Sequence, residues 1–167
     1  MEKRVKSIEL LNRAVADEMT ALNQYMYFHF LLEDMGYELL SSYFKRTAIA
    51  EMRHVERLAE RILFLKGEVE MRASENVDKI HDVERMLKKA EQLESDTITN
   101  YNKWAREAAD AADAATKKLF EDLIGEEEEH QDRFDTEIDN LHNFGDNYLA
   151  LQSIENSKKA AAGLLTT

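Results

Sequence analysis

The absence of proline is the feature that most constrains this sequence. Proline removes a backbone hydrogen bond and interrupts helices, and glycine weakens a helix interior. None of the 167 residues is proline and only five are glycine, so the chain lacks nearly all of the residues that stop long helices. Charged residues make up 34% of it, in stretches rich in Ala, Leu, Glu, Lys and Arg, a composition typical of helical proteins. We therefore predict an all-α fold, and the length leaves room for one domain with a sizeable core.

Composition also excludes several functional classes. The chain has no cysteine, which excludes disulfides, thiolate zinc sites, iron–sulfur clusters and a rubredoxin-type module. A net charge of −12 disfavours nucleic acid, because phosphates attract basic surfaces. No apolar run approaches the ~20 residues of a membrane span, and the N-terminus is charged rather than signal-like. We expect a cytoplasmic protein without a nucleic-acid or membrane partner.

Apolar residues at helical spacing divide the chain into four long segments. The first ends at the turn formed by residues 34–36, and the second covers about residues 38–65. The third covers about residues 83–109, and the fourth covers residues 112–143. The connector 68–82 lacks clear periodicity and is long enough to cross the length of a bundle.

Loop lengths predict the topology. Short turns join the first two segments and the last two, so each pair should form an antiparallel hairpin. A long crossover between the second and third helices then gives a ferritin-like four-helix bundle. Residues 146–157 are expected to add a short fifth, C-terminal helix. We expect residues 1–157 to form one domain and residues 158–167 a flexible tail.

Each predicted helix carries a carboxylate on the face that should be buried. When the apolar stripe of each helix is followed at spacings of three and four residues, polar residues interrupt it at Glu18, Glu51, His54, Glu94, Glu127 and His130. No stripe position is Lys or Arg. An unpaired buried carboxylate costs several kcal/mol or becomes protonated, whereas two divalent cations would balance four glutamates. We therefore predict a dinuclear metal site in the middle of the bundle.

Two of these interruptions share one spacing. Glu51/His54 and Glu127/His130 both read Glu-x-x-His, which places a carboxylate and an imidazole on one helix face, about 4.5 Å apart along the axis. Two such pairs plus one glutamate from each remaining helix is the arrangement of di-iron proteins with a ferritin-like bundle. Carboxylate and imidazole ligands without thiolate suit Fe or Mn, with Zn as an inert occupant.

The sequence around these residues resembles the bacterioferritin family. The resemblance is carried by EMTALNQYMYFH from Glu18, EMRHVERLAERILFLKG from Glu51, EEEEHQDRF from Glu126 and NYLALQ from Asn147. It implies that the six stripe residues are iron ligands, with Glu51 and Glu127 bridging two irons. It also implies a ferroxidase that oxidises Fe(II) with dioxygen or peroxide and stores Fe(III) mineral in a hollow shell of twenty-four subunits. A ferredoxin-type reductant would release the iron.

The same resemblance implies a haem. Met52 follows Glu51, so helical geometry turns it about 100° away from the bundle core. By the resemblance it would be an axial haem ligand, paired with the same residue of a two-fold partner. Met19, Leu22, Asn23 and Met26 would line the pocket. The alternative is that Met52 packs in a subunit interface, as methionine often does. The expected cofactors are two Fe per subunit and one b-type haem shared between two subunits.

The sequence departs from the family at two pairs of positions. Some bacterioferritins hold inner-surface iron with a His and an Asp on the second helix, where this chain has Arg46 and Ala50. That substitution argues against an inner site of this kind. Some members also carry aromatic residues near the di-iron site, where this chain has Leu58 and Arg133. Tyr25 is then the one redox-capable ring expected beside the centre.

Three other functions fit the sequence less well. A rubrerythrin-like peroxide scavenger would need the missing cysteines of a rubredoxin centre. A DNA-protecting mini-ferritin has its ferroxidase site between subunits, which would not require four in-phase core carboxylates, and this chain has no basic tail. A metal-free structural bundle would leave six polar core residues without compensation.

The remaining conspicuous residues receive structural interpretations. We expect His29, His81 and His142 to be structural or surface groups, because none has a paired carboxylate in phase. Glu126, Glu128 and Glu129 should form a solvated or cavity-lining face, and Trp104 should contribute packing.

Overall fold

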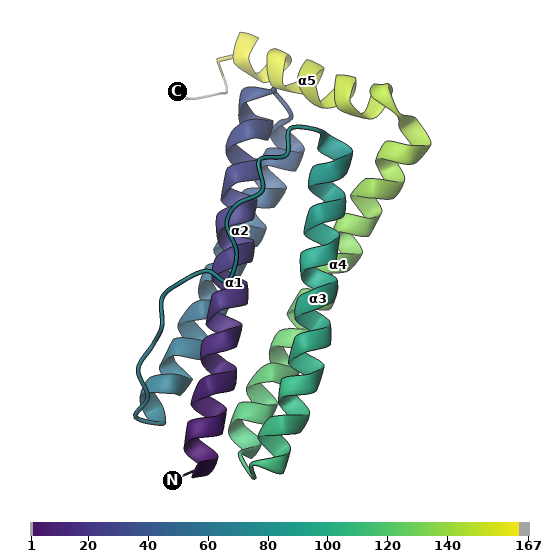
Figure 1. Ribbon diagram of the computed structural model, residues 1–167. Helices are drawn as coiled ribbons and strands as arrows, with labels where there is room; N and C mark the ends of the chain where they lie inside the picture. Colours follow the sequence, from purple (N-terminus) through teal and green to yellow (C-terminus); the bar gives the residue numbers. More distant parts are fainter. Residues whose placement is uncertain (1, 164–167) are drawn as a thin grey trace.

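The computed structural model describes residues 2–163, and Figure 1 shows their five helices. They are α1 (Glu2–Asp34), α2 (Glu38–Phe64), α3 (Val83–Asp110), α4 (Ala114–Phe144) and α5 (Asp146–Ala161). No strand occurs in this range. Among the same residues, no helix combines the length and the apolar character that a membrane crossing requires. The predicted bundle of four long helices with a short fifth is confirmed.

Two apolar cores lie along the bundle. The first core includes Leu11, Leu58, Trp104 and Phe120 and lies toward the α3–α4 turn. The second core includes Phe28, Phe44, Leu87 and Phe134 and lies toward α5. Burying a large apolar side chain stabilises a fold by about 1.5–3 kcal/mol, so these two clusters hold the four helices together. The residues between the clusters are polar, and that layer contains the predicted metal site.

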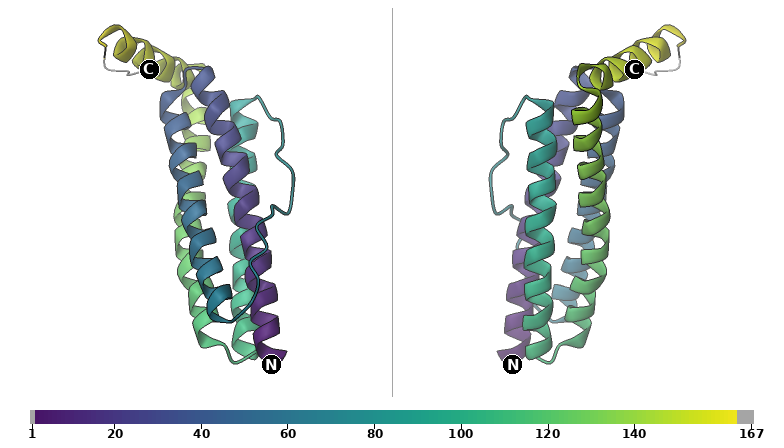
Figure 2. Two further views of the ribbon diagram at one scale, coloured as in Figure 1. Left: turned by 90° about the vertical axis from the view of Figure 1, so that its left-hand side faces the viewer. Right: turned by 90° about the vertical axis from the view of Figure 1, so that its right-hand side faces the viewer.

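The crossover between α2 and α3 runs along the outside of the bundle, as predicted (Figure 2). Side chains of α1 hold it by its backbone. The amide of Asn12 bonds to the backbone of Glu68 and Glu70 at 2.9 Å, and the buried amide of Gln24 bonds to both backbone groups of Asp78 at 2.7 and 3.0 Å. The crossover is therefore ordered although it lacks helix and strand.

Two helix ends use a left-handed residue that is not glycine. At the end of α2, Lys66 has φ 62°, and after α3, Ala112 has φ 56°. The backbone N–H of Asp113 donates to the carbonyl of Ala108 at 2.9 Å, and that of Ala112 donates to Ala109 at 2.8 Å. These bonds close α3 and allow Asp113 to cap α4, where its side chain accepts from the Thr116 N–H.

Helix α5 lies across one end of the bundle (Figure 1) and is longer than predicted. It continues to Ala161, so the expected end at residue 157 is too early and residues 158–161 are helical rather than a flexible tail. Polar contacts dock α5 against α2, and one of them involves a residue of the extension. Gln152 accepts from the Leu40 N–H at 3.3 Å, and Lys159 forms a 3.1 Å ion pair with Glu38. Residues 164–167 of the predicted tail lie outside the described range.

The strain at Ala112 leads to a stability prediction. We expect Ala112→Gly to raise the free energy of unfolding by about 0.5–1 kcal/mol, because a left-handed residue with a Cβ costs roughly 1–2 kcal/mol and glycine recovers part of it. Ala111→Gly is the matched control, since Ala111 has φ −76° and should lose stability. Urea unfolding at one fixed protein concentration measures both changes. If both variants lose stability, the left-handed conformation of Ala112 is not strained.

Candidate metal centre

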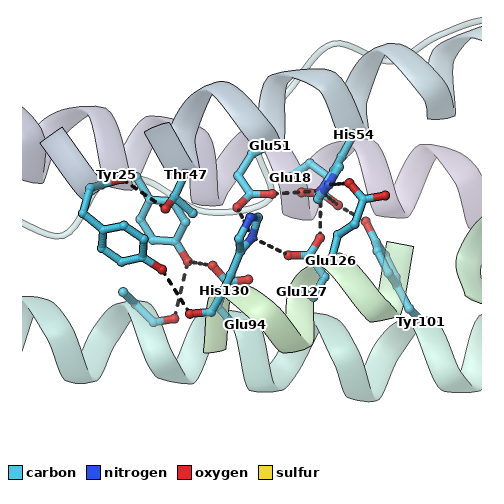
Figure 3. A network of polar contacts seen from close by, with 12 residues as sticks. Glu18, Tyr25, Thr47, Glu51, His54, Glu94, Tyr101, Glu126, Glu127 and His130 are labelled. Atoms are coloured by element: carbon cyan, nitrogen blue, oxygen red, sulfur yellow. Dashed lines mark hydrogen bonds and ion pairs between the residues drawn. The ribbon is translucent and has the colours of Figure 1, made fainter. Parts of the chain in front are cut away.

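Six polar side chains meet between the two apolar cores. They are Glu18 of α1, Glu51 and His54 of α2, Glu94 of α3, and Glu127 and His130 of α4 (Figure 3). The five side chains other than His130 are at most 2% exposed, and the His130 side chain is 16% exposed. The helical spacing of the apolar stripes thus brings together the six residues that interrupt them.

The six residues form two overlapping groups. The ligand atoms of Glu18, Glu51, His54 and Glu127 lie within 4.8 Å of one another, and so do those of Glu51, Glu94, Glu127 and His130. Glu51 and Glu127 belong to both groups, whereas Glu18 and Glu94 each belong to one. The arrangement is that of two adjacent cation positions with two shared carboxylates.

The shared carboxylates divide their oxygens between the two histidines. His54 Nδ1 lies 2.9 Å from Glu51 Oε2 and 2.8 Å from Glu127 Oε1. His130 Nδ1 lies 3.1 Å from Glu51 Oε1 and 3.2 Å from Glu127 Oε2. Each carboxylate therefore turns one oxygen toward each half of the centre, which is the orientation that bridging requires.

Several buried atoms of the centre lack a hydrogen bond. Within the described residues, both carboxylate oxygens of Glu51, Oε1 of Glu127 and Nδ1 of His54 have none, because their contacts of 2.8–3.1 Å with one another and with His130 lack hydrogen-bond geometry. Leaving such atoms unsatisfied costs about 1–3 kcal/mol each. Carboxylate oxygens and an imidazole nitrogen are the donors that Fe, Mn and Zn accept, so metal binding would satisfy all of them. The donor set fits a dinuclear metal site.

Without metal, the centre compensates its negative charge with protons. Burial raises the pKa of Glu18 well above its ordinary value, and the Glu127 carboxylate raises it further. Burial and the Glu51 carboxylate raise the pKa of Glu94 in the same way. Burial alone would lower the pKa of His130, but its contacts with Glu127 and Glu51 outweigh burial and raise that pKa to about 10. Bound cations would take over the role of these protons.

Two tyrosines hold the unshared glutamates. Tyr25 donates to Glu94 Oε1 at 2.5 Å, and Tyr101 donates to Glu18 Oε1. Only Tyr25 was predicted beside the centre, and Tyr101 corrects that prediction by adding a second phenol. The sequence contains a pattern that could have predicted the second tyrosine. Tyr25 follows Glu18 by seven residues and Tyr101 follows Glu94 by seven. Seven residues are about two helical turns, so each tyrosine lies on the same helix face as its glutamate.

Glu126 contacts the centre from the face on which it was predicted. It was expected on a solvated or cavity-lining face and its side chain is 47% exposed, but its Oε2 also lies 3.1 Å from His54 Nε2. Arg57 donates to its other oxygen, Oε1. Sequence periodicity did not reveal this contact, because Glu126 lies outside the apolar stripe and its partners are on another hairpin.

The other histidines and Trp104 lie away from the centre. His29 is buried, and its Nδ1 lies 2.9 Å from Ser41 Oγ. His142 contacts Glu84 at 3.0 Å near the surface, and His81 is exposed. Trp104 packs on Tyr101 with ring centroids 5.7 Å apart.

Of the residues proposed for haem, Met19 packs against the first core and Met26 against the second, whereas Met52 faces outward. Met52 is 45% exposed on α2, while Met19, Asn23 and Met26 of α1 are half-buried. None of the four belongs to the metal centre. Of the positions that depart from the family, Arg46 and Arg133 are exposed, Ala50 is half-buried and Leu58 is part of the first core.

Comparisons with known proteins agree with this geometry. The profile of the ferritin-like domain family, Ferritin, matches residues 8–144. A bacterioferritin from Desulfovibrio desulfuricans is 36% identical over 149 residues, which cover 89% of this chain and 83% of the relative. A bacterioferritin from Brucella melitensis is 33% identical over 147 residues, covering 87% and 91%.

A solved structure gives the same result. The X-ray structure of the Desulfovibrio desulfuricans bacterioferritin, described with its diiron site in different catalytic states, superposes with a TM-score of 0.89 at 36% identity. The match covers 91% of this chain and 89% of that one. With the fold, the four-helix origin of the six polar residues and these relatives in agreement, the chain belongs to the bacterioferritin family.

Proposed function

We propose that this chain is the subunit of an iron store that oxidises Fe(II) at the buried centre and holds the Fe(III) product as a mineral. The single observation that carries the proposal is the pair of overlapping ligand groups that share Glu51 and Glu127. All six residues come from one chain, which disfavours a mini-ferritin with its site between subunits. The relatives named above support the proposal, because they are bacterioferritins and one has a diiron site.

In this proposal each residue has a definite role. Glu18 and His54 bind one iron, Glu94 and His130 bind the other, and Glu51 and Glu127 bridge them. Tyr101 and Tyr25 hold the two unshared glutamates in place through the hydrogen bonds described above. The two apolar cores on either side restrict access of water.

Fe(II) is the substrate of the proposed reaction. Two Fe(II) ions give up one electron each, and the pair of electrons with two protons converts dioxygen to hydrogen peroxide, or peroxide to two waters. The chain contributes the negative charge of four carboxylates, which stabilises Fe(III) more than Fe(II) because the product carries more positive charge. A ferredoxin-type reductant would return electrons when iron is released.

Ferroxidase activity is tested by removing one unshared ligand. We expect Glu18→Ala to abolish the fast phase of Fe(II) oxidation, because one of the two iron positions loses a carboxylate. The fold should persist, because the two apolar cores hold the helices together and a buried acid does not stabilise a metal-free core. Stopped-flow absorbance after mixing apoprotein with Fe(II) and dioxygen measures the rate. Glu129→Ala removes an exposed carboxylate and is the control. A fast phase of parental rate in Glu18→Ala would show that the site is misassigned.

Storage requires a closed shell, and exposed apolar residues support one. Ile49 and Leu63 of α2 and Leu151 and Ile154 of α5 are 38–62% exposed, although large exposed apolar areas are uncommon on monomers. We propose that α1 and α2 pair subunits about a two-fold axis and that α5 packs where further subunits meet.

Gel filtration tests the assembly. At 19.4 kDa per chain, a twenty-four-subunit shell should elute near roughly 470 kDa. Deleting residues 146–167 should weaken the assembly and leave a helical subunit, because it removes α5. Elution of the full chain as a dimer would contradict storage and favour a peroxide-scavenging enzyme of the rubrerythrin type.

Haem binding is a separate part of the proposal. The thioether of Met52 lies on the outer side of α2 rather than in the bundle. In a two-fold dimer this surface meets itself, so one methionine from each chain would reach a shared haem plane. Met19 and Met26, with Leu22, would supply apolar walls, and Asn23 a polar contact. Two neutral thioether ligands favour reduced iron, which would suit electron entry for iron release.

The haem proposal predicts an absorption band of bound haem, and it predicts that replacing Met52 removes this band. Protein produced with ample haem should show a Soret band equivalent to one haem per two chains. Met52→Leu should remove that band because it removes both axial ligands, and it should retain the shell and ferroxidase activity. Met71→Leu, at an exposed crossover position, is the matched control. Retention of haem by Met52→Leu would assign Met52 to packing alone.

A further inference from the structure

The two halves of the metal centre differ in what contacts the outer ring nitrogen, Nε2, of their histidines. We propose that Glu126 and Arg57 form a positioning pair that orients His54 and makes the Glu18–His54 half the tighter of the two metal positions. This inference rests on the proposed function and deepens it, because it assigns unequal affinities to the two positions and names the residues that set them.

The pair extends outward from His54 in a continuous chain of contacts. His54 Nδ1 faces the bridging carboxylates at 2.8 and 2.9 Å. Its other ring nitrogen, Nε2, lies 3.1 Å from Glu126 Oε2, and Arg57 donates to Glu126 Oε1. The His54 side chain is 1% exposed, whereas those of Glu126 and Arg57 are 47% and 34% exposed. The pair therefore links a buried residue of the centre to the surface, and Figure 3 shows its first contact, between His54 and Glu126.

This contact selects one tautomer of His54. A neutral imidazole carries a single proton, and the nitrogen that binds metal must present a lone pair. With Glu126 accepting from Nε2, the proton is held there and Nδ1 is free for the metal. Such outer carboxylates fix ring orientation and increase ligand basicity. Arg57 in turn restrains the carboxylate by a charge-assisted hydrogen bond.

His130 lacks an equivalent partner. Its contacts with carboxylates, to Glu51 and Glu127, use Nδ1, and within residues 2–163 no hydrogen bond involves its Nε2. The pocket on that side is lined by Tyr43, Arg46, Thr47, His130 and Arg133, so it offers no carboxylate to the ring. Nothing there selects the metal-binding tautomer of His130.

The sequence shows how this asymmetry arises. The two ligand helices share the pattern Glu-x-x-His-x-x-Arg, as Glu51-His54-Arg57 and Glu127-His130-Arg133. The residue that precedes the first glutamate is Glu126 on α4 but Ala50 on α2. Since Glu126 reaches the histidine of α2, a carboxylate at position 50 would be placed to reach the histidine of α4. Alanine at position 50 leaves His130 without this support.

A metal titration that involves no turnover tests the inference. Metal-stripped, assembled protein is titrated with Co(II) without oxygen, by calorimetry and by the visible absorption of bound Co(II). The parental protein should bind two equivalents with unequal affinity. Glu126→Ala should weaken the tight equivalent by about 10–100-fold and leave the weak one within about threefold. Glu126→Asp should restore most of the loss, which a purely structural role would not predict.

Two further variants test whether the position of the carboxylate, rather than its charge alone, sets the affinity. Glu128→Ala removes an exposed carboxylate from the same helix and should leave both affinities unchanged, which separates positioning from a general loss of charge. Ala50→Glu should tighten the weak equivalent, because it supplies His130 with the missing carboxylate. Circular dichroism verifies that each variant is folded.

The outcomes separate this inference from the proposed function. If the parental protein binds fewer than two Co(II) per chain, the dinuclear centre itself is wrong. If it binds two, but Glu126→Ala binds both as tightly as the parent or weakens both equally, only the positioning role is overturned. The same holds if Ala50→Glu leaves the weak equivalent unchanged.

Discussion

The constraint on which the structure depends is the burial of four carboxylates and two imidazoles between two apolar cores. Each group alone would destabilise the core, and the orphaned oxygens of Glu51 and Glu127 show that protein hydrogen bonds do not fully compensate them. Apolar packing on both sides supplies the free energy that keeps these groups buried. The centre is therefore strained without cations and has a strong electrostatic reason to bind them. Long uninterrupted helices are needed because the polar layer lies mid-bundle, far from every turn.

The scaffold distributes the six polar residues of the centre by an approximate internal repeat. Each hairpin supplies one helix with a glutamate followed seven residues later by tyrosine, and one helix with Glu-x-x-His-x-x-Arg. The tyrosine of each hairpin donates to the unshared glutamate of the other. The hydrogen bonds around the centre thus tie the two hairpins to each other. The crossover, held on α1 by Asn12 and Gln24, connects the hairpins without entering the centre.

The two halves of the repeat differ in the residues that surround the two histidines. Glu126 supports His54, while Ala50 leaves His130 facing a pocket whose charged side chains are Arg46 and Arg133. His130 is also the most exposed of the six side chains. Substrate and product exchange is physically easiest at a ligand that is partly solvated and weakly restrained. A tight position and a looser one side by side would suit the proposed function, in which iron is first bound and then passed on.

The sequence by itself determined the helices, the long crossover and the six polar residues of the centre. These features follow from local periodicity: an apolar stripe defines a buried face, and a glutamate on that face is recognisable within one helix. Tertiary structure alone decided which oxygen of Glu51 and Glu127 faces which histidine. It also decided that Glu126 contacts His54 and that α5 extends to Ala161. The cross-helix contacts behind these features join residues 69 or more positions apart, and the length of α5 goes with the docking of Gln152 and Lys159 against α2. No periodicity within one helix records which distant side chain will lie opposite it.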